Sequence, residues 1–218
     1  MNKRELINGI KKEVGLSDFN AVHVGAGTVS LVRSKQGVRE EIVFSYLKYP
    51  ETYVLQPVIS GWKTFDALED ILEKHFVKNK MAYTRVSIHC KSRRFQNMIL
   101  NKIKMMEDIK MMEVELNTMI HKDVIPFFSD YETLTDVYAN VKELGKDFVS
   151  INNFLFDPQP IRRIALAFIN KDHLWKEEAN RILNAFVEEK NNSGENIYAG
   201  YIKVLKDLIK DLSSHSSE

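Results

Sequence analysis

The stretch TVSLVRSKQGVREEIVFSYLKY, residues 28–49, decides the expected fold. Both of its halves are rich in Val, Ile, Phe and Tyr, a composition typical of β-strands, and the polar SKQG segment between them is a turn signal. Similar runs occupy residues 19–24 and 52–60, set off by Gly25-Ala26-Gly27 and Pro50-Glu51. We therefore expect an antiparallel meander, with a fifth strand over residues 85–90.

Helices are expected on both sides of these strands. Apolar residues spaced three and four apart predict one helix over residues 3–14 and another over residues 64–76. In the second helix one face is apolar, comprising Phe65, Leu68, Leu72 and Phe76. The opposite face is acidic, comprising Asp66, Glu69, Asp70 and Glu73, and we expect it to face solvent.

From residue 93 onwards the spacing of apolar residues is helical. A long helix is expected over residues 93–124, stopped by Pro126, because its apolar residues keep a strict four-three spacing; they are Met105, Ile109, Met112, Leu116 and Met119. We expect this row to be buried by the chain itself or by an identical subunit. Shorter helices follow, and residues 213–218 are expected to form a disordered tail.

These elements predict an α+β fold with an N-terminal helix, a mainly antiparallel meander sheet, then a long helix and a C-terminal helical bundle. The apolar spacing changes from two residues to three or four near Lys91. This change divides the chain into a sheet subdomain over residues 1–90 and a helical subdomain over residues 91–212 that packs on it.

The composition is that of an ordinary globular protein, with 218 residues, 44% hydrophobic and 28% charged. The single cysteine, Cys90, cannot form a disulfide within the chain, and residues 1–10 lack the unbroken apolar stretch of a signal peptide. The longest apolar runs are far shorter than the roughly 18 residues that a membrane span needs. We therefore expect a cytoplasmic protein that does not enter the membrane.

Patterns typical of catalytic and metal sites are missing from the sequence. None of the six histidines has another histidine three to five residues away, as helical zinc sites generally require. Gly25-Ala26-Gly27 lacks the helix of a dinucleotide loop, and Cys90 is expected to be a buried, unreactive thiol. The sequence thus favours a non-enzymatic protein with no cofactor and no metal. An enzyme with a dispersed site stays open as an alternative.

Charge is distributed unevenly along the chain. Residues 74–106 contain nine Lys or Arg and no Asp or Glu, although the formal net charge of the protein is +1. Such a segment is typical of a surface that attracts an acidic partner or another anion. The candidate residues for this surface are Arg85, Lys91, Arg93, Arg94 and Lys102. Alternatively, these cations are merely solvated or pair with Glu40, Glu41 or the acidic helix face.

Three of the candidates, Lys91, Arg93 and Arg94, lie where the fifth strand is expected to give way to the long helix. The first backbone amides of a helix and its dipole favour anions, so a helix beginning there would add to the attraction. Nucleic acid is the less favoured partner, because the whole chain is nearly neutral and only Tyr83 and Phe95 are aromatic residues close to the candidate cations.

Residues 55–145 also carry a family resemblance. Trp62 precedes the helix with Leu68 and Leu72, and Ile125-Pro126-Phe127-Phe128 is followed by Leu134. In these features the chain resembles an uncharacterised family of small bacterial α+β proteins known only as a domain of unknown function. The resemblance implies a bacterial, intracellular α+β protein and assigns no catalytic or binding residue.

The preferred hypothesis is a non-enzymatic intracellular binding protein that acts through a surface near residues 85–104. An immunity-type or accessory protein for a bacterial effector is one version of it. The alternatives are binding of nucleic acid or a phosphate ligand through residues 74–106, and the enzyme with a dispersed site. A homodimer formed through the long helix is a further expectation.

Overall fold

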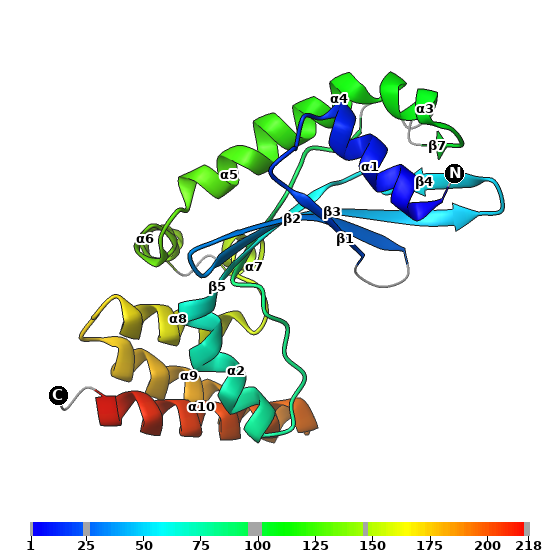
Figure 1. Cartoon of the computed structure of the whole chain (residues 1–218). Coiled ribbons are helices and arrows are strands. Elements are labelled where there is room, and N and C mark those ends of the chain that lie inside the picture. The colour runs from blue at the N-terminus through cyan, green and yellow to red at the C-terminus, as the bar shows by residue number, and fades with distance from the viewer. Residues whose placement is uncertain (1, 24–26, 96–101, 146–147, 216–218) are drawn as a thin grey trace. The chain divides into compact units, whose positions relative to one another are not determined.

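A computed structural model describes residues 2–23, 27–95, 102–145 and 148–215. The chain forms two compact units (Figure 1). The sheet unit comprises Met1–Thr64 and Ile88–Glu132, and the helical unit comprises Phe65–Ser87 and Thr133–Glu218. This division differs from the one expected from the sequence, which placed a single border near residue 91.

The α+β fold class is confirmed, with a helix first, an antiparallel sheet next and helices after it. The strands are β1 (Asn20–His23), β2 (Thr28–Lys35), β3 (Val38–Tyr49), β4 (Thr52–Leu55), β5 (Ser60–Phe65), β6 (Ile88–Lys91) and β7 (Lys102–Ile103). They follow the order β1-β2-β3-β4-β7, and β5 pairs with β3 and β6. The expected meander is therefore present in β1 to β4.

The turn between β2 and β3 fixes the register of the sheet. Lys35 pairs with Val38, which leaves a two-residue loop of Gln36 and Gly37 whose φ angles are 50° and 76°. Positive φ at both central residues is the geometry of a type I′ turn, whose twist matches that of the two strands. Leu31 and Ile42 are fully buried partners in the resulting pair of strands.

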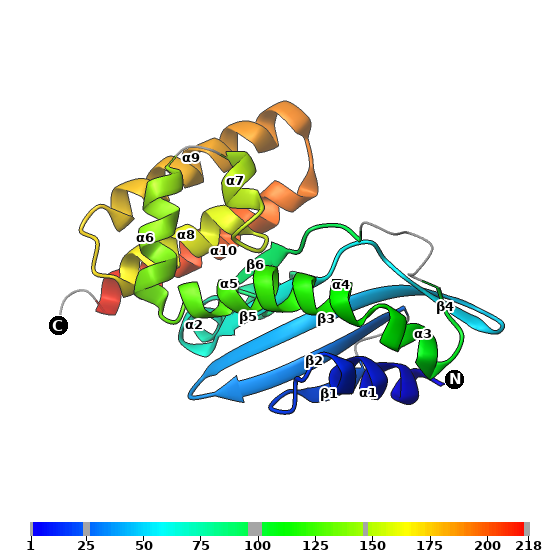
Figure 2. The same cartoon turned by 90° about the horizontal axis from the view of Figure 1, so that it is seen from above.

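Helices cover one face of this sheet (Figures 1 and 2). They are α1 (Lys3–Glu13), α3 (Met106–Met111), α4 (Glu113–Met119), the π-helical segment η1 (Ile120–Val124) and α5 (Ile125–Asp130). The expected burial of the four-three row is confirmed for Ile109, Met112, Leu116 and Met119. Met105 is not buried by the chain itself, because its exposed fraction is 56%, and its burial by an identical subunit stays a prediction.

The predicted start of the long helix at residue 93 is wrong. Residues 92–95 are neither helix nor strand, β7 occupies Lys102–Ile103, and the helical run begins at Met106. The Asp108 carboxylate explains this start, because it accepts hydrogen bonds from the backbone N–H groups of Lys104 and Met105, at 2.7 and 3.0 Å. Residues 96–101 lie outside the described residues.

The helical unit contains α2 (Asp66–Lys78), α6 (Leu134–Leu144), α7 (Phe148–Asn152), α8 (Gln159–Ile169), α9 (Trp175–Ser193) and α10 (Asn196–His215). The predicted apolar face of α2 is confirmed, since Phe65, Leu68, Leu72 and Phe76 are all buried. Helix α10 includes residues 213–215, where a disordered tail was expected, and residues 216–218 lie outside the described residues.

Candidate functional site

The segment after β6, residues 92–95, carries two of the predicted site residues, Arg93 and Arg94, and is firmly attached to the sheet unit. Ser92 N–H donates to the Ile59 carbonyl at 2.8 Å, and Ile59 N–H donates to Ser92 Oγ at 3.0 Å. Three residues on, Phe95 N–H donates to the Pro57 carbonyl at 2.9 Å, and the Phe95 side chain is buried. The backbone around Arg93 and Arg94 is thus held at both ends.

Arg93 is committed to a contact inside the sheet unit. Its Nε and Nη2 donate to the two carboxylate oxygens of Asp123 at 2.9 and 2.7 Å, and its backbone N–H donates to Asp123 Oδ2 at 2.8 Å. These bonds lower the pKa of the Asp123 carboxyl and raise the pKa of Arg93. Paired donation to a carboxylate is the strong form of this interaction, so Arg93 fastens the segment to η1.

Within residues 92–95, the part of this segment that the structure describes, no helix begins beside these cations, because the backbone there is irregular. The expected contribution of a helix dipole at Arg93 and Arg94 is therefore wrong. What the sequence did not reveal is the partner of Arg93. Asp123 lies 30 residues further along the chain and sits in a π-helical turn, a rare geometry that is frequent at functional sites.

Arg94 is exposed and lines a hollow of about 200 Å³ on the sheet unit. The hollow is bordered by the irregular segment and by α4, through Arg93, Arg94, Phe95, Val114, Glu115, Thr118 and Met119. Val114 of α4 is 79% exposed, and Met111, the last residue of α3, is 66% exposed. We call the exposed side chains Lys91, Arg94, Met111 and Val114 the Arg94 surface.

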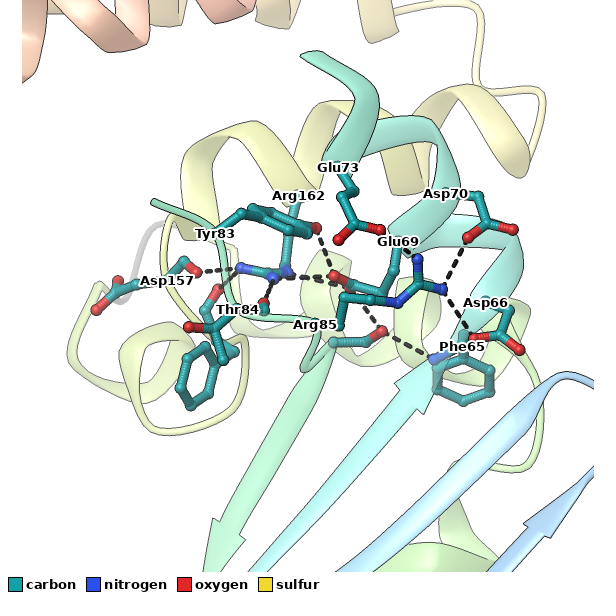
Figure 3. A network of polar contacts seen from close by, with 12 residues as sticks. Phe65, Asp66, Glu69, Asp70, Glu73, Tyr83, Thr84, Arg85, Asp157 and Arg162 are labelled. Atoms are coloured by element: carbon teal, nitrogen blue, oxygen red, sulfur yellow. Dashed lines mark hydrogen bonds and ion pairs between the residues drawn. The ribbon is translucent and has the colours of Figure 1, made fainter. Parts of the chain in front are cut away.

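The two remaining candidates lie elsewhere. Lys102 is exposed on β7, where it pairs with Val54 of β4. Arg85 belongs to the helical unit and donates to three carboxylates of α2 (Figure 3), those of Glu73 at 2.6 Å, Asp70 at 2.7 Å and Asp66 at 2.9 Å. These bonds raise the pKa of Arg85, and the bond to Glu73 contributes most. The alternative foreseen from the sequence, pairing with the acidic helix face, applies to Arg85.

Next to Arg85 lies a buried ion pair that sequence reasoning missed (Figure 3). Glu69 of α2 and Arg162 of α8 are both 0% exposed, and Arg162 Nε and Nη2 donate to the two Glu69 oxygens at 3.2 and 3.0 Å. The expectation that Glu69 faces solvent is therefore wrong. Its partner lies 93 residues away, so the local pattern of α2 gives no sign of it.

Every polar atom of this pair has a partner. The remaining Arg162 N–H groups donate to the backbone carbonyls of Thr84, at 2.7 Å, of Phe156, at 2.8 Å, and of Asp157. Glu69 also accepts from Ser87 Oγ at 2.7 Å and from the Tyr83 hydroxyl, and burial raises the pKa of Tyr83. A carboxylate and a guanidinium satisfied in this way hold the helical unit together and have no donor or acceptor left for a ligand.

Metal and membrane sites receive no support from the described part of the chain. Its His, Cys, Asp and Glu residues form no group of three or more that could hold a metal ion. None of its helices combines the length and the apolar composition that a bilayer crossing requires. Comparisons with protein-family models, curated proteins and solved structures each gave no match. The fold is that of an α+β protein.

Proposed function

We propose that this is a non-enzymatic binding protein that holds an acidic protein partner on the Arg94 surface. The observation that supports it best is that Arg94 and Val114, a cation and a highly exposed apolar side chain, line the same hollow. Arginine and methionine are enriched at protein interfaces, whose buried centre is more apolar than the rest of the protein surface. An immunity-type or accessory protein for a bacterial effector is one version of this proposal.

The firm attachment of residues 92–95 to the sheet unit favours binding of a partner. Two backbone hydrogen bonds, the bond from Ile59 N–H to Ser92 Oγ and the Arg93–Asp123 pair already hold residues 92–95 in place. A partner that meets Arg94 therefore does not have to order the backbone beneath it, which lowers the entropic cost of association. Met111 adds an adaptable apolar contact, since methionine fits surfaces of varied shape.

The charges of residues 74–106 and of their ion-pair partners favour a protein over a nucleic acid as the partner. At least four of the nine cations between residues 74 and 106 form ion pairs, Lys74 with Asp211, Lys78 with Asp207, Arg85 with the acids of α2 and Arg93 with Asp123. The positive field of this segment is correspondingly weaker than its sequence suggests. A phosphate backbone needs many cations together, whereas a protein interface needs a few cations around an apolar centre.

Affinity capture with a photocrosslinking amino acid at position 114 tests the proposal directly. The bait is the full chain, incubated with a nuclease-treated lysate of the organism that makes it, and crosslinked proteins are identified by mass spectrometry. We expect the charge reversal Lys91→Glu with Arg94→Glu to reduce crosslinking of the partner roughly tenfold or more, because the cations both attract and orient an acidic surface.

The matched control is Lys12→Glu, a charge reversal at an exposed position of α1 that does not line the hollow. It should leave crosslinking unchanged. Retention of the same partner by the Lys91 and Arg94 double variant, with unchanged circular dichroism, would refute the proposal. If the original chain gives the crosslink in an untreated lysate and loses it in the nuclease-treated one, the partner is a nucleic acid and the alternative function is correct.

A further inference from the structure

Strand β1 stands at the end of the sheet. In the order β1-β2-β3-β4-β7 it pairs with β2, and none of the other described strands pairs with it. The side chains of Asn20, Ala21 and Val22 are exposed. The outer edge of a terminal strand carries backbone N–H and C=O groups that can pair with an added strand.

The register of the sheet identifies which backbone groups point outwards. Lys35 and Val38 flank the two-residue turn and exchange hydrogen bonds, so the odd-numbered residues of β2 face β3 and the even-numbered residues face β1. On β1, Asn20 and Val22 are paired with Val32 and Ser30 and therefore bond to β2. The backbone N–H and C=O groups of Ala21 and His23 consequently point to the open edge.

A hollow of about 460 Å³ lies beside this edge, between α1 and the first two strands. Its apolar part comes from Ile7, Ala21, Val22 and Val29, and its charged part from Lys3 and Arg4 of α1. Both charged side chains are cations, and none of the described residues that line the hollow carries a carboxylate. An occupant matched to this site has an extended backbone, small apolar side chains and acidic side chains.

We propose that β1 is a docking edge for an extended acidic segment of a partner protein, which adds to the sheet as a further strand. The backbone of the segment pairs with Ala21 and His23, and its carboxylates meet Lys3 and Arg4. Strand addition of this kind takes affinity from main-chain hydrogen bonds and specificity from the pockets for alternate side chains. This site is separate from the Arg94 surface and does not rest on it.

A second copy of the chain is the less suitable occupant. Antiparallel pairing of β1 with the β1 of a second copy, about a two-fold axis normal to the sheet, places both α1 helices on one face of the joined sheet. Lys3 and Arg4 of one copy then approach the same cations of the other, and like charges across an interface oppose association. The charge of the hollow therefore selects an acidic partner.

Two fluorescein-labelled heptapeptides test the proposal, one alternating Glu and Val and the other alternating Lys and Val. Binding to the full chain is measured by fluorescence anisotropy at low salt. We expect the Glu peptide to bind roughly tenfold or more tightly than the Lys peptide, since only the former complements Lys3 and Arg4. Arg4→Glu should weaken binding of the Glu peptide, and Lys12→Glu should not.

Ala21→Pro tests the backbone contact, because it removes an N–H that points away from β2 and spares the ladder between β1 and β2. It should abolish binding of the Glu peptide, whereas Ala21→Ser, which keeps the amide, should bind like the original chain. Should Ala21→Pro fail to fold, His23→Pro removes the second outward amide in its place.

Three results would overturn the docking edge. They are equal binding of the two peptides, undiminished binding of the Glu peptide by a folded proline variant, and absence of binding at millimolar peptide. A concentration-dependent dimer that Ala21→Pro dissociates, measured by analytical ultracentrifugation, would instead assign the edge to a second copy and refute the acidic segment.

Discussion

Glu69 and Arg162 form an ion pair with neither side chain exposed to solvent, and the pair joins α2 to α8. Two charges removed from water are tolerated only where the geometry is good and every remaining donor and acceptor is satisfied. The bonds from Tyr83 and Ser87 and to three backbone carbonyls meet that condition. The pair is therefore a point at which one substitution has a large effect.

Replacement of Glu69 by alanine should lower the free energy of unfolding by about 3 to 5 kcal/mol, because it leaves the Arg162 charge buried and uncompensated. Urea denaturation followed by circular dichroism measures the change. Glu73→Ala on the same helix is the matched control, since Glu73 is 40% exposed and should cost about 0 to 1 kcal/mol. Equal losses for the two variants would contradict the structural role of the buried pair.

Two adjacent methionines provide a comparison of burial. Met112 is fully buried, so Met112→Ala should cost about 2 to 5 kcal/mol through the lost contacts and the cavity left behind. Met111 points to solvent, and Met111→Ala should change stability by no more than about 0.5 kcal/mol. Thermal melting distinguishes the two. A large loss from Met111→Ala would show that the side chain is covered in solution, as in a homodimer.

Cys90 should react slowly with alkylating reagents. Burial raises the pKa of its thiol to about 12, so the thiolate that attacks iodoacetamide is scarce at pH 8. Mass spectrometry should show slow modification of the folded chain and rapid modification in urea. In a Cys90→Ser background, Val114→Cys places the thiol at an exposed position and should react at the ordinary rate. Rapid alkylation of folded Cys90 would be inconsistent with this environment.

His75 should make the helical unit less stable as the pH falls. Its Nε2 lies 3.4 Å from Asp211 Oδ2, near Lys74 and Lys78 of its own helix and Asp207 of α10, and burial lowers the pKa of its imidazole. The unfolded chain therefore binds the proton more readily. The contribution of neutral His75 to the free energy of unfolding is fully present above the unfolded pKa of about 6.5. It is lost as the pH falls below that value, by at most about 1.4 kcal/mol per pH unit.

Denaturation of the wild type and of His75→Gln between pH 7 and pH 5 measures this effect, and the variant should show a flatter dependence. Asp207 and Asp211 titrate in a different window. Hydrogen bonds from Asn79 and from Lys74 lower the pKa of their respective carboxyls, so they affect stability only below about pH 4. Identical slopes for the wild type and His75→Gln between pH 7 and pH 5 would rule out a contribution from His75.

The elements predicted well from the sequence are those with local causes. The range of β3, residues 38–49, was predicted to the residue because turn signals stand on both sides of it and its composition is that of a strand. The strand predicted over residues 52–60 is instead two strands. Gly61 lies within the second of them, where a Cβ would come within 2.8 Å of Cys90 Sγ and Val124 Cγ1, a close approach that periodicity does not register.

The wrong predictions concern features that depend on residues far away in the sequence. The four-three row of apolar residues continues back to Met105, but the residues before it form β7 by pairing with β4, which local spacing cannot reveal. The site was predicted only in part for the same reason. Lys91 and Arg94 are exposed as expected, whereas the partners of Arg93 and Arg85 come from other elements and account for much of the apparent excess of positive charge.

The two units share the chain in alternation, because it passes between them at residues 64–65, 87–88 and 132–133. During synthesis, the sheet unit can be completed only after residue 132 has left the ribosome, when the segment 65–87 of the other unit has already emerged. The apolar face of α2 can be buried only after α8 and α10, which contact it, have also been synthesised. A gene truncated at any single position therefore cannot encode one complete unit without also encoding part of the other.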